Sequence, residues 1–350
     1  MGTGFDDTTR RFAKLFQAAM RVNGNSVPFD GCHFPYSSAL LVRAIDGFCS
    51  VPVRGTTFAT RAFPMGSGGN CLVCVSARTI VLMEWVAGTV PIYLDRWAIQ
   101  PHGDTVTTPS SWLVPGRWHD RDVMLKVARI AEEDRGGPVL AWWAGSAAAE
   151  VYEVSDQAVL MNRAAGQRDL TTMSQTGLDD EVTHILCGTI SSLHSASATS
   201  AAPAGIVPLS QWFHDLIGAD AARLQAGSTA RAATMARELL EASDIEAQVV
   251  LHGDVHHGNV LDFDGRWLAI DPKGLFGHRA FDYANIFCNP ATDLALSNFH
   301  RRLAIVSEHS GLDVDVVRSW VIAWCALSVT WTDNSGGQPW TAHAILSEFG

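Results

Sequence analysis

The order of hydrophobic and polar positions divides the chain into a strand-rich part and a helix-rich part. From Arg96 to Gly166, short apolar runs are bounded by Gly, Pro, Ser and Thr residues, which is typical of strands. The strands predicted there are Thr105–Thr108, Ser111–Pro115, Val123–Ala128 and Gln157–Met161. After Gly166 the apolar residues recur with the spacing of helices. The pattern therefore predicts an α+β protein in which a small sheet precedes a larger helical part.

The helix-rich part is interrupted by two strands. From Asp179 to His194, apolar residues recur about every 3.6 positions, as they do on one face of a helix. The other predicted helices are Leu209–Ile217, Thr229–Ala242, Phe281–Phe287, Ala295–His309 and Val314–Trp331. The two strands are Gln248–His252 and Trp267–Asp271, and a turn is expected between them.

A shorter helix is predicted in the strand-rich part, from Ile130 to Trp143. Gly136-Gly-Pro138 lies in the middle of this segment. Proline lacks the backbone N–H of a helical turn and its ring collides with the preceding turn. We therefore expect the helix to be interrupted at this point.

Residues 1–95 differ in pattern from the rest and form an extension of unknown role. One amphipathic helix is predicted in it, from Thr8 to Met20. Its longest apolar run, residues 70–90, is broken by Arg78 and Glu84, so it falls short of the roughly 20 apolar residues of a membrane span. The acidic N-terminus is unlike a secretory signal, which favours a cytoplasmic protein. A start site assigned too far upstream is a second explanation for this extension.

Composition limits the kind of partner. The 350 residues are 47% hydrophobic, which is sufficient for two or three domains with a buried core. A formal net charge of -11 argues against a general nucleic-acid binder and suits a small or cationic partner. Seven cysteines, an odd number in a long chain, do not indicate a disulfide framework.

The segment His252-Gly-Asp-Val-His-His-Gly-Asn259 carries the most informative chemistry of the chain. Asp254 is followed by an amide at Asn259 and, beyond the next strand, by a second carboxylate at Asp271. Phosphoryl transfer requires one group that orients the attacking hydroxyl and oxygen ligands for Mg²⁺. This spacing therefore indicates a small-molecule kinase.

A lysine in an apolar strand adds to this interpretation. Lys126 lies in the middle of Val123–Ala128, and Glu132 and Glu133 follow on the predicted helix. A lone lysine in such a strand usually lies on a solvated face. Kinase folds, however, use a lysine held by a helix glutamate to reach the phosphates of ATP. Together with the Asp/Asn/Asp set, a nucleotide-binding role becomes the favoured one.

These segments resemble a known family. Residues 96 to about 331 are similar to the aminoglycoside phosphotransferases, in particular to the streptomycin 6-phosphotransferase branch and its hydroxyurea phosphotransferase relatives. The stretches that carry the resemblance include Ser110-Ser-Trp-Leu-Val-Pro115, Met124-Leu-Lys-Val-Ala-Arg-Ile130, Leu251-His-Gly-Asp-Val-His-His257 and Phe281-Asp-Tyr-Ala-Asn-Ile-Phe287. The resemblance implies a protein-kinase-like bilobal fold with an N-lobe at 96–165, a C-lobe at 166–350, and ATP with Mg²⁺ between them.

The resemblance also implies a role for individual residues. Asp254 would be the catalytic base, Asn259 and Asp271 would hold Mg²⁺, and His252 and His256 would brace the loop. Lys126 would reach the phosphates of ATP, with Glu133 as its partner and Glu132 as the alternative. The other residues implied at the nucleotide are Ser110 and Ser111 over the phosphates, and Met161, Asn162 and Ala164 beside adenine.

The implied acceptor is streptomycin, phosphorylated at its 6-hydroxyl, and its guanidinium groups call for carboxylates. The candidates are Asp282, Asp293, Glu308, Asp313 and Asp315, each of which could equally be a solvated or capping residue. Another small hydroxyl compound, such as a different aminoglycoside, hydroxyurea or a sugar-like metabolite, is an alternative. Two further alternatives are a zinc hydrolase built on His252-x-Asp254-x-His256-His257 and a catalytically silent binding module of kinase shape.

Overall fold

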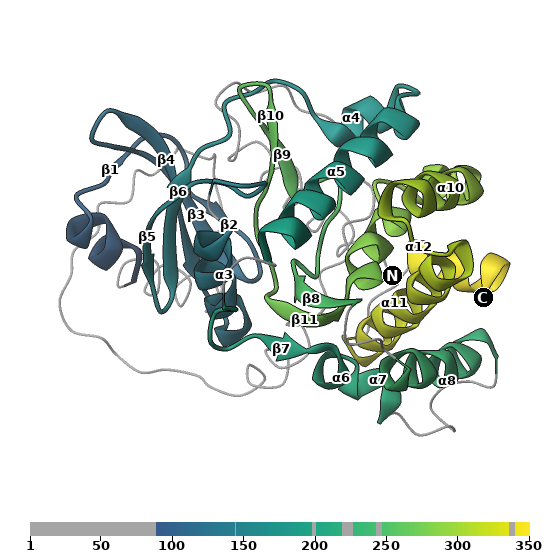
Figure 1. Cartoon of the computed structure of the whole chain (residues 1–350). Helices are drawn as coiled ribbons and strands as arrows, with labels where there is room; N and C mark the ends of the chain where they lie inside the picture. Colours follow the sequence, from purple (N-terminus) through teal and green to yellow (C-terminus); the bar gives the residue numbers. More distant parts are fainter. Residues whose placement is uncertain (1–88, 144, 198–200, 219–226, 243–246, 336–339) are drawn as a thin grey trace, which may run out of the picture.

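The computed structural model describes residues 89–350 except 144, 198–200, 219–226, 243–246 and 336–339 (Figure 1). The helix predicted at Thr8–Met20 and most of the apolar run at 70–90 lie outside the described residues. The described chain forms a strand-rich lobe followed by a lobe made mainly of helices (Figure 1). This is the bilobal arrangement that the resemblance implied.

The N-lobe contains an antiparallel sheet. Its strands are β1 (Gln100–Pro101), β2 (Val106–Thr107), β3 (Ser111–Trp118), β4 (Arg121–Ala128), β5 (Val151–Ser155) and β6 (Ala158–Asn162). They are ordered β1-β3-β4-β6-β5, with β2 paired to β3. Lys126 on β4 lies between Leu113 of β3 and Val159 of β6, in the centre of the sheet. The strands predicted from the apolar runs are therefore confirmed.

A helix at residues 89–96 packs against one face of this sheet (Figure 1). Val90, Tyr93 and Trp97 are buried with Leu125 and Leu160 in one hydrophobic cluster. Burying such side chains removes apolar surface from water and stabilises the contact. This helix therefore belongs to the N-lobe, although the sequence pattern assigned residues up to 95 to a separate extension.

The other face of the sheet carries a short 3-10 helix, η2 (Ala131–Arg135), and α3 (Gly136–Trp142). The predicted interruption is confirmed, because the chain changes from a 3-10 to an α-helix at Gly136. A Cβ atom at Gly136 would lie 2.7 Å from the carbonyl oxygen of Pro272. Glycine is thus required where this helix approaches the chain segment that follows Asp271.

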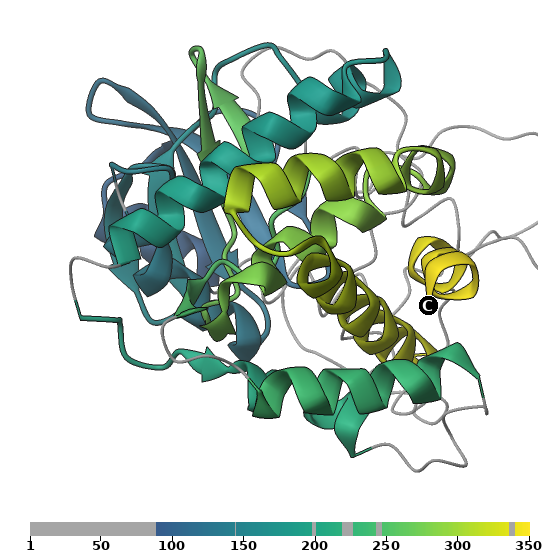
Figure 2. The ribbon, with the colours of Figure 1, turned by 45° about the vertical axis from the view of Figure 1, so that its right-hand side comes forward.

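The C-lobe is mainly helical (Figure 2). Its helices are α4 (Leu170–Gln175), α5 (Asp179–Ser197), α6 (Leu209–Trp212), α7 (His214–Ile217), α8 (Ser228–Glu241), η4 (Arg279–Cys288), α9 (Thr292–Ser297), α10 (Phe299–Ser310), α11 (Val314–Ser335) and α12 (Trp340–Phe349). Three predictions are corrected. The single helices predicted at Leu209–Ile217 and Ala295–His309 are each divided into two, and Phe281–Phe287 lies in the 3-10 helix η4.

Short strands of the C-lobe position the predicted catalytic segment. They are β7 (Val207–Pro208), β8 (Gln248–Leu251), β9 (Val260–Phe263), β10 (Arg266–Ala269) and β11 (Leu275–His278). β9 and β10 form a hairpin, while β11 lies between β7 and β8. Residues 252–259 connect β8 to β9, and residues 270–274 connect β10 to β11. Each connection runs between the two small sheets, so both of its ends are held in place by a strand.

Helix α11 is the one described helix that is long and apolar enough to cross a membrane by length and composition. Of its most apolar window, 67% is buried inside the protein. Trp320, Trp324 and Trp331 are all buried in the main hydrophobic cluster. The tryptophans therefore act as core residues, and α11 has the burial of a core helix.

Candidate active site

The loop at 252–259 is braced by two of its histidines. The buried ring of His252 stacks on Trp143, with its Nε2 2.9 Å from the carbonyl oxygen of Ile270. Its Nδ1 accepts a hydrogen bond of 3.2 Å from the N–H of Asp254. In the same way, His256 Nδ1 accepts from the N–H of Gly258 at 3.0 Å. The bracing role predicted for both histidines agrees with these hydrogen bonds.

Asp254 lies between two amide side chains. Its Oδ1 accepts a hydrogen bond of 2.6 Å from Asn285, and its Oδ2 accepts one of 3.2 Å from Asn259. Asn259 Nδ2 also donates to the backbone oxygen of Asp254 at 2.9 Å. Burial raises the pKa of Asp254 to about 6, and the positive charge of Lys273 opposes this shift. A carboxylate with a raised pKa in a fixed geometry is suited to accept a proton.

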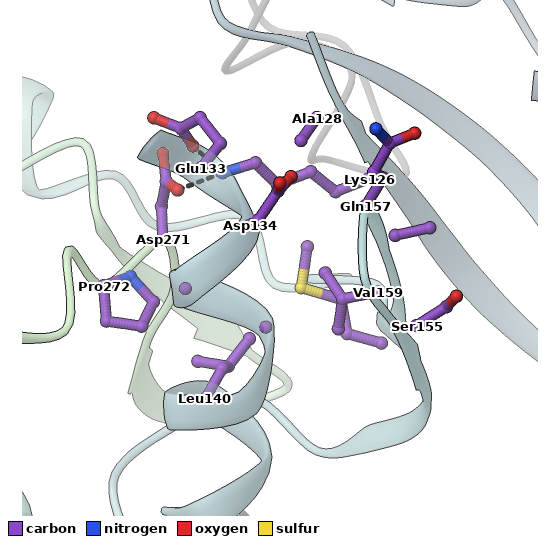
Figure 3. A pocket seen from close by; sticks show the side chains of 14 residues that line it. Lys126, Ala128, Glu133, Asp134, Leu140, Ser155, Gln157, Val159, Asp271 and Pro272 are labelled. Atoms are coloured by element: carbon purple, nitrogen blue, oxygen red, sulfur yellow. Dashed lines mark hydrogen bonds and ion pairs between the residues drawn. The ribbon is translucent and has the colours of Figure 1, made fainter. Parts of the chain in front are cut away.

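A second cluster joins the two lobes. Lys126 on β4 forms ion pairs with Glu133 of η2 and with Asp271 (Figure 3). Glu133, and not the alternative Glu132, is therefore the partner of Lys126 in this structure. Lys273 completes the cluster, with its Nζ 2.8 Å from Oε1 of Glu133. All four side chains are largely buried.

The charges of this cluster stabilise one another. Burial alone would lower the pKa of Lys126, but the carboxylates of Asp271 and Glu133 outweigh it and raise that pKa. Burial would likewise raise the pKa of Asp271, yet Lys126 and Lys273 hold it below its usual value. The cluster therefore keeps its cations and the Asp271 carboxylate charged inside the protein.

Backbone hydrogen bonds tie the loop of Asp254 to the segment of Asp271. The N–H of Ile270 donates to the carbonyl oxygen of Asn259 at 2.9 Å, and the N–H of Lys273 donates to the carbonyl oxygen of His252 at 2.7 Å. Between them, Asp271 adopts a left-handed conformation with φ 63. Such conformations are strained for most residues and often occur at functional sites. The three residues predicted to act together are thus held in two connected loops.

Asp282 was predicted as an acceptor ligand, and the structure contradicts this role. Its side chain is only 1% exposed and accepts hydrogen bonds from the N–H groups of His252 at 3.1 Å and Gly253 at 2.7 Å. His194 Nε2 lies 2.8 Å from the same carboxylate. Asp282 therefore anchors the start of the predicted catalytic loop, and its buried carboxylate is not accessible to a substrate.

The other predicted acceptor ligands lie on the surface of the C-lobe. Asp293, Glu308, Asp313 and Asp315 are exposed on or beside α9, α10 and α11. Asp313 Oδ1 accepts from the N–H of Asp315 at 2.8 Å, which caps the start of α11. Between the described residues, no hydrogen bond or ion pair links these four to the loop of Asp254.

A pocket lies between η2, α3 and the N-lobe sheet, next to the charged cluster (Figure 3). Lys126, Glu133, Met161 and Asp271 line it, together with the apolar side chains of Leu140 and Val159 and others. It thus contains three of the predicted cofactor residues and one predicted metal ligand. It lies on the side of the sheet that faces α3.

The remaining predicted nucleotide residues do not line this pocket. Ser110 lies in the turn between β2 and β3, and Ser111 is the buried first residue of β3. The carbonyl oxygen of Ser110 accepts from the N–H of Arg129 at 2.7 Å. The N–H of Asn162 is already bonded to the carbonyl oxygen of Glu150 at 2.8 Å. This N–H is therefore not available to adenine, which corrects part of the contact expected of Asn162, while Ala164 follows in the chain between the lobes.

Sequence reasoning missed Lys273 and Asn285, which contact the predicted site residues Glu133 and Asp254. Lys273 could have been found because it follows Asp271 by two positions. Asn285 could have been found because it is a polar residue within the apolar segment from Phe281 to Phe287, and a buried polar side chain requires a hydrogen-bond partner. Nothing in the sequence indicated Asn289, which donates to Oδ1 of Asn285 at 3.0 Å.

The side chains near Asp254 indicate which metal ions the site could hold. Among the described residues, no group of three or more His, Cys, Asp or Glu side chains could hold a metal ion. His252 has both ring nitrogens engaged, so the zinc hydrolase interpretation lacks this ligand. Mg²⁺ is usually held by only one or two protein oxygen ligands together with substrate phosphates. Asn259 donates through Nδ2 and keeps its amide oxygen for such an ion, and Asp271 is ionised nearby.

The bilobal fold, with a lysine–glutamate pair in the N-lobe and an Asp/Asn/Asp set in the C-lobe, defines a protein-kinase-like phosphotransferase. A solved structure of an amicoumacin kinase in complex with AMP-PNP and Ca²⁺ has the same fold, with a TM-score of 0.54 and 11% identity. The match covers 77% of this chain and 94% of that one. At this identity the likeness supports the fold alone.

Sequence comparison defines the family. Residues 96–336 match the aminoglycoside/hydroxyurea antibiotic resistance kinases. The chain is 43% identical to a streptomycin 3″-kinase of Klebsiella pneumoniae, over 69% of this chain and 92% of that protein. It is 26% identical to a streptomycin 6-kinase of Streptomyces griseus, over 72% of this chain and 85% of that one. The chain belongs to the aminoglycoside/hydroxyurea antibiotic resistance kinase family, whose members transfer phosphoryl groups to hydroxyl acceptors.

Proposed function

We propose that this protein transfers the γ-phosphoryl group of ATP to a hydroxyl group of streptomycin and so confers resistance. The observation that carries the proposal is the position of Asp254, held by two amides in a loop that is bonded to the Asp271 segment. Family membership and the names of the two relatives support an aminoglycoside as the acceptor. The net charge of -11 suits a cationic substrate.

The acceptor position has two candidates. The resemblance found in the sequence implied the 6-hydroxyl, and a relative with that name is 26% identical. The relative named for the 3″ position is 43% identical, which favours the 3″-hydroxyl. We therefore propose the 3″-hydroxyl as the position of transfer, with the 6-hydroxyl as the alternative.

Each group in the site has a defined task in this reaction. Asp254 would orient the acceptor hydroxyl and take its proton, while Lys126 would contact the α- and β-phosphates of ATP. Asn259 and Asp271 would hold Mg²⁺, which supplies positive charge to the phosphates when bound. The backbone of Ala164 would contact adenine, and the turn at Ser110 and Ser111 would cover the phosphates. Because the protein mainly supplies alignment and charge, displacement of a single group should slow the reaction.

Replacing Lys126 by methionine is expected to raise the KM for ATP by about 10–100-fold, since a charge-assisted hydrogen bond contributes roughly 1.5–3 kcal/mol. Titration calorimetry with AMP-PNP should show the same loss of affinity. Arg121→Met is the matched control, because Arg121 lies on the same strand and its partner Glu150 is exposed. An unchanged affinity of Lys126→Met would remove Lys126 from the nucleotide site.

The proposed reaction can be tested with a panel of acceptors. The protein is incubated with ATP, Mg²⁺ and streptomycin, kanamycin, hygromycin or hydroxyurea, and each product is analysed by mass and by NMR. We expect streptomycin to gain one phosphoryl group at its 3″-oxygen. Asp254→Ala, purified identically, controls for a contaminating kinase. Modification of another compound while streptomycin stays intact would favour the alternative of a kinase for a different small hydroxyl compound.

A further inference from the structure

A row of buried amide side chains leads from Asp254 into the C-lobe. Asn285, in η4, donates its Nδ2 to Asp254 Oδ1 at 2.6 Å. Asn289 follows directly after η4 and donates its own Nδ2 to Asn285 Oδ1 at 3.0 Å. Both asparagines are only 6% exposed. The hydrogen bond between the two asparagines is therefore shielded from competition with water, and the one to the partly exposed Asp254 is shielded at its donor.

The direction of these hydrogen bonds is fixed at both ends. An ionised carboxylate can only accept, so Asn285 must present its N–H group to Asp254 and its oxygen to Asn289. Asn289 must then donate, and its Nδ2 also donates to the backbone oxygen of Asn285 at 3.1 Å. Neither amide can turn over without placing two acceptors or two donors against each other.

The far end of the row is anchored by a buried arginine. Arg302 of α10 donates through Nη1 to the carbonyl oxygens of Ile286 and Asn289, each at 2.7 Å. Its other nitrogens contact the carboxylate of Asp179 on α5 at 2.9 and 2.6 Å. The backbone around Asn289 is thus fixed between η4, α10 and α5. This fixation leaves Asn289 little freedom to move away from Asn285.

Asp254 needs such support because its own torsion does not define where its oxygens point. Rotation about the bond to a carboxylate is broad and roughly two-fold, unlike the staggered torsions of the chain. Its orientation must come from hydrogen bonds, and the bond from Asn285 is the shorter of the two from side chains. The second donor, Asn259, is the residue expected to turn its amide oxygen toward Mg²⁺.

We propose that Asn285 and Asn289 are positioning residues, which aim the Asp254 carboxylate at the acceptor hydroxyl through this row of amides. The proposal rests on the phosphotransferase function proposed above. Asn285 acts on Asp254 directly, whereas Asn289 acts only through the orientation of Asn285. Neither residue contacts the Lys126–Glu133–Asp271 cluster, so nucleotide binding does not depend on them.

The decisive variant is Asn289→Asp, which keeps the shape of the side chain and removes its donor. Asn285 would then turn its N–H group toward the new carboxylate and its oxygen toward Asp254, pushing that carboxylate aside. We expect kcat for streptomycin to fall about 10–100-fold while the KM values for ATP and streptomycin change less than about 3-fold. A residue that merely filled space would not produce this split between kcat and KM.

Two further variants support the interpretation. Asn285→Ser removes the donor to Asp254 without burying a charge and should lower kcat by a similar factor, so the test remains if Asn289→Asp does not fold. Asn298→Asp is the matched control, because Asn298 donates only to the carbonyl oxygen of Leu294, at 3.1 Å, outside the row. It should keep the wild-type kcat. Wild-type kcat in Asn285→Ser would overturn the proposal.

A crystal structure of Asn285→Ser provides a readout that requires no acceptor. We expect the Asp254 carboxylate to be rotated relative to Asn259 or to occupy two conformers, while His252 and Asp282 keep their contacts. A single unchanged orientation of Asp254 would contradict the positioning role. If the wild-type enzyme phosphorylates no acceptor, the proposed function fails, yet this structure still decides whether the amides orient Asp254.

Discussion

Replacing Asp254 by alanine is expected to lower kcat by about 10²–10⁴-fold and to leave ATP binding close to that of the wild type. The loss is large because Asp254 is the carboxylate that two amides hold, and its pKa of about 6 leaves it ionised at neutral pH. ATP binding should persist because the ion pairs of Lys126 with Glu133 and Asp271 do not involve Asp254.

The measurement combines steady-state kinetics with calorimetry. The kcat is determined at saturating ATP and acceptor, and the Kd of AMP-PNP is measured on the same preparations. Asp104→Ala, at an exposed aspartate of the N-lobe, is the control and should match the wild type in both quantities. A kcat of Asp254→Ala within about 3-fold of the wild type would show that another group takes the proton.

The parts of the site that are local in sequence could be predicted from it. Lys126 and Glu133 are seven positions apart, joined by one turn from strand to helix, so their pairing follows from the local chain path. Asp254 and Asn259 are five positions apart in one loop. In these cases the order of residue types already restricts the geometry, because few arrangements of so short a segment exist.

Contacts between distant segments could not be predicted in the same way. Asp282 has the residue type expected of a ligand for a cationic acceptor, yet it lies beneath the loop and bonds to His252, thirty positions earlier. The sequence shows that a carboxylate is present but not which way it faces. The same holds for Asn289 and Arg302, whose partners are defined only once η4, α5 and α10 are packed.

Helix boundaries show a related limit. The residues of η4 from Ala280 to Cys288 are all buried, so this segment has no single apolar face that could distinguish a period of about 3.0 residues from one of about 3.6. At Asn298, where α9 and α10 are divided, the side-chain amide donates to the carbonyl oxygen of Leu294 at 3.1 Å. Asparagine competes for backbone partners in this way, and the apolar pattern continues across it.

Replacing Arg302 by methionine is expected to lower the free energy of unfolding by about 3–5 kcal/mol, which is the typical cost of removing one partner of a buried ion pair. Arg302 is 0% exposed, and its guanidinium engages Asp179 and two carbonyl oxygens. Methionine fills similar space but removes the guanidinium donors from the buried Asp179 carboxylate and from both carbonyl oxygens, and leaves Asp179 only its hydrogen bond from Ser174. Urea unfolding, followed by tryptophan fluorescence, measures the change.

Arg301, the neighbour of Arg302, provides the matched control. Arg301 precedes Arg302 on α10, and it pairs with Asp180, the neighbour of Asp179, at 2.9 and 2.7 Å. Its side chain is 63% exposed and that of Asp180 is 48% exposed. Exposed pairs contribute roughly 0.2–1 kcal/mol, so Arg301→Met should shift the unfolding midpoint only slightly. The two ion pairs join the same two helices. Equal losses of unfolding free energy in both variants would therefore mean that burial does not determine how much the Arg302 pair stabilises the protein.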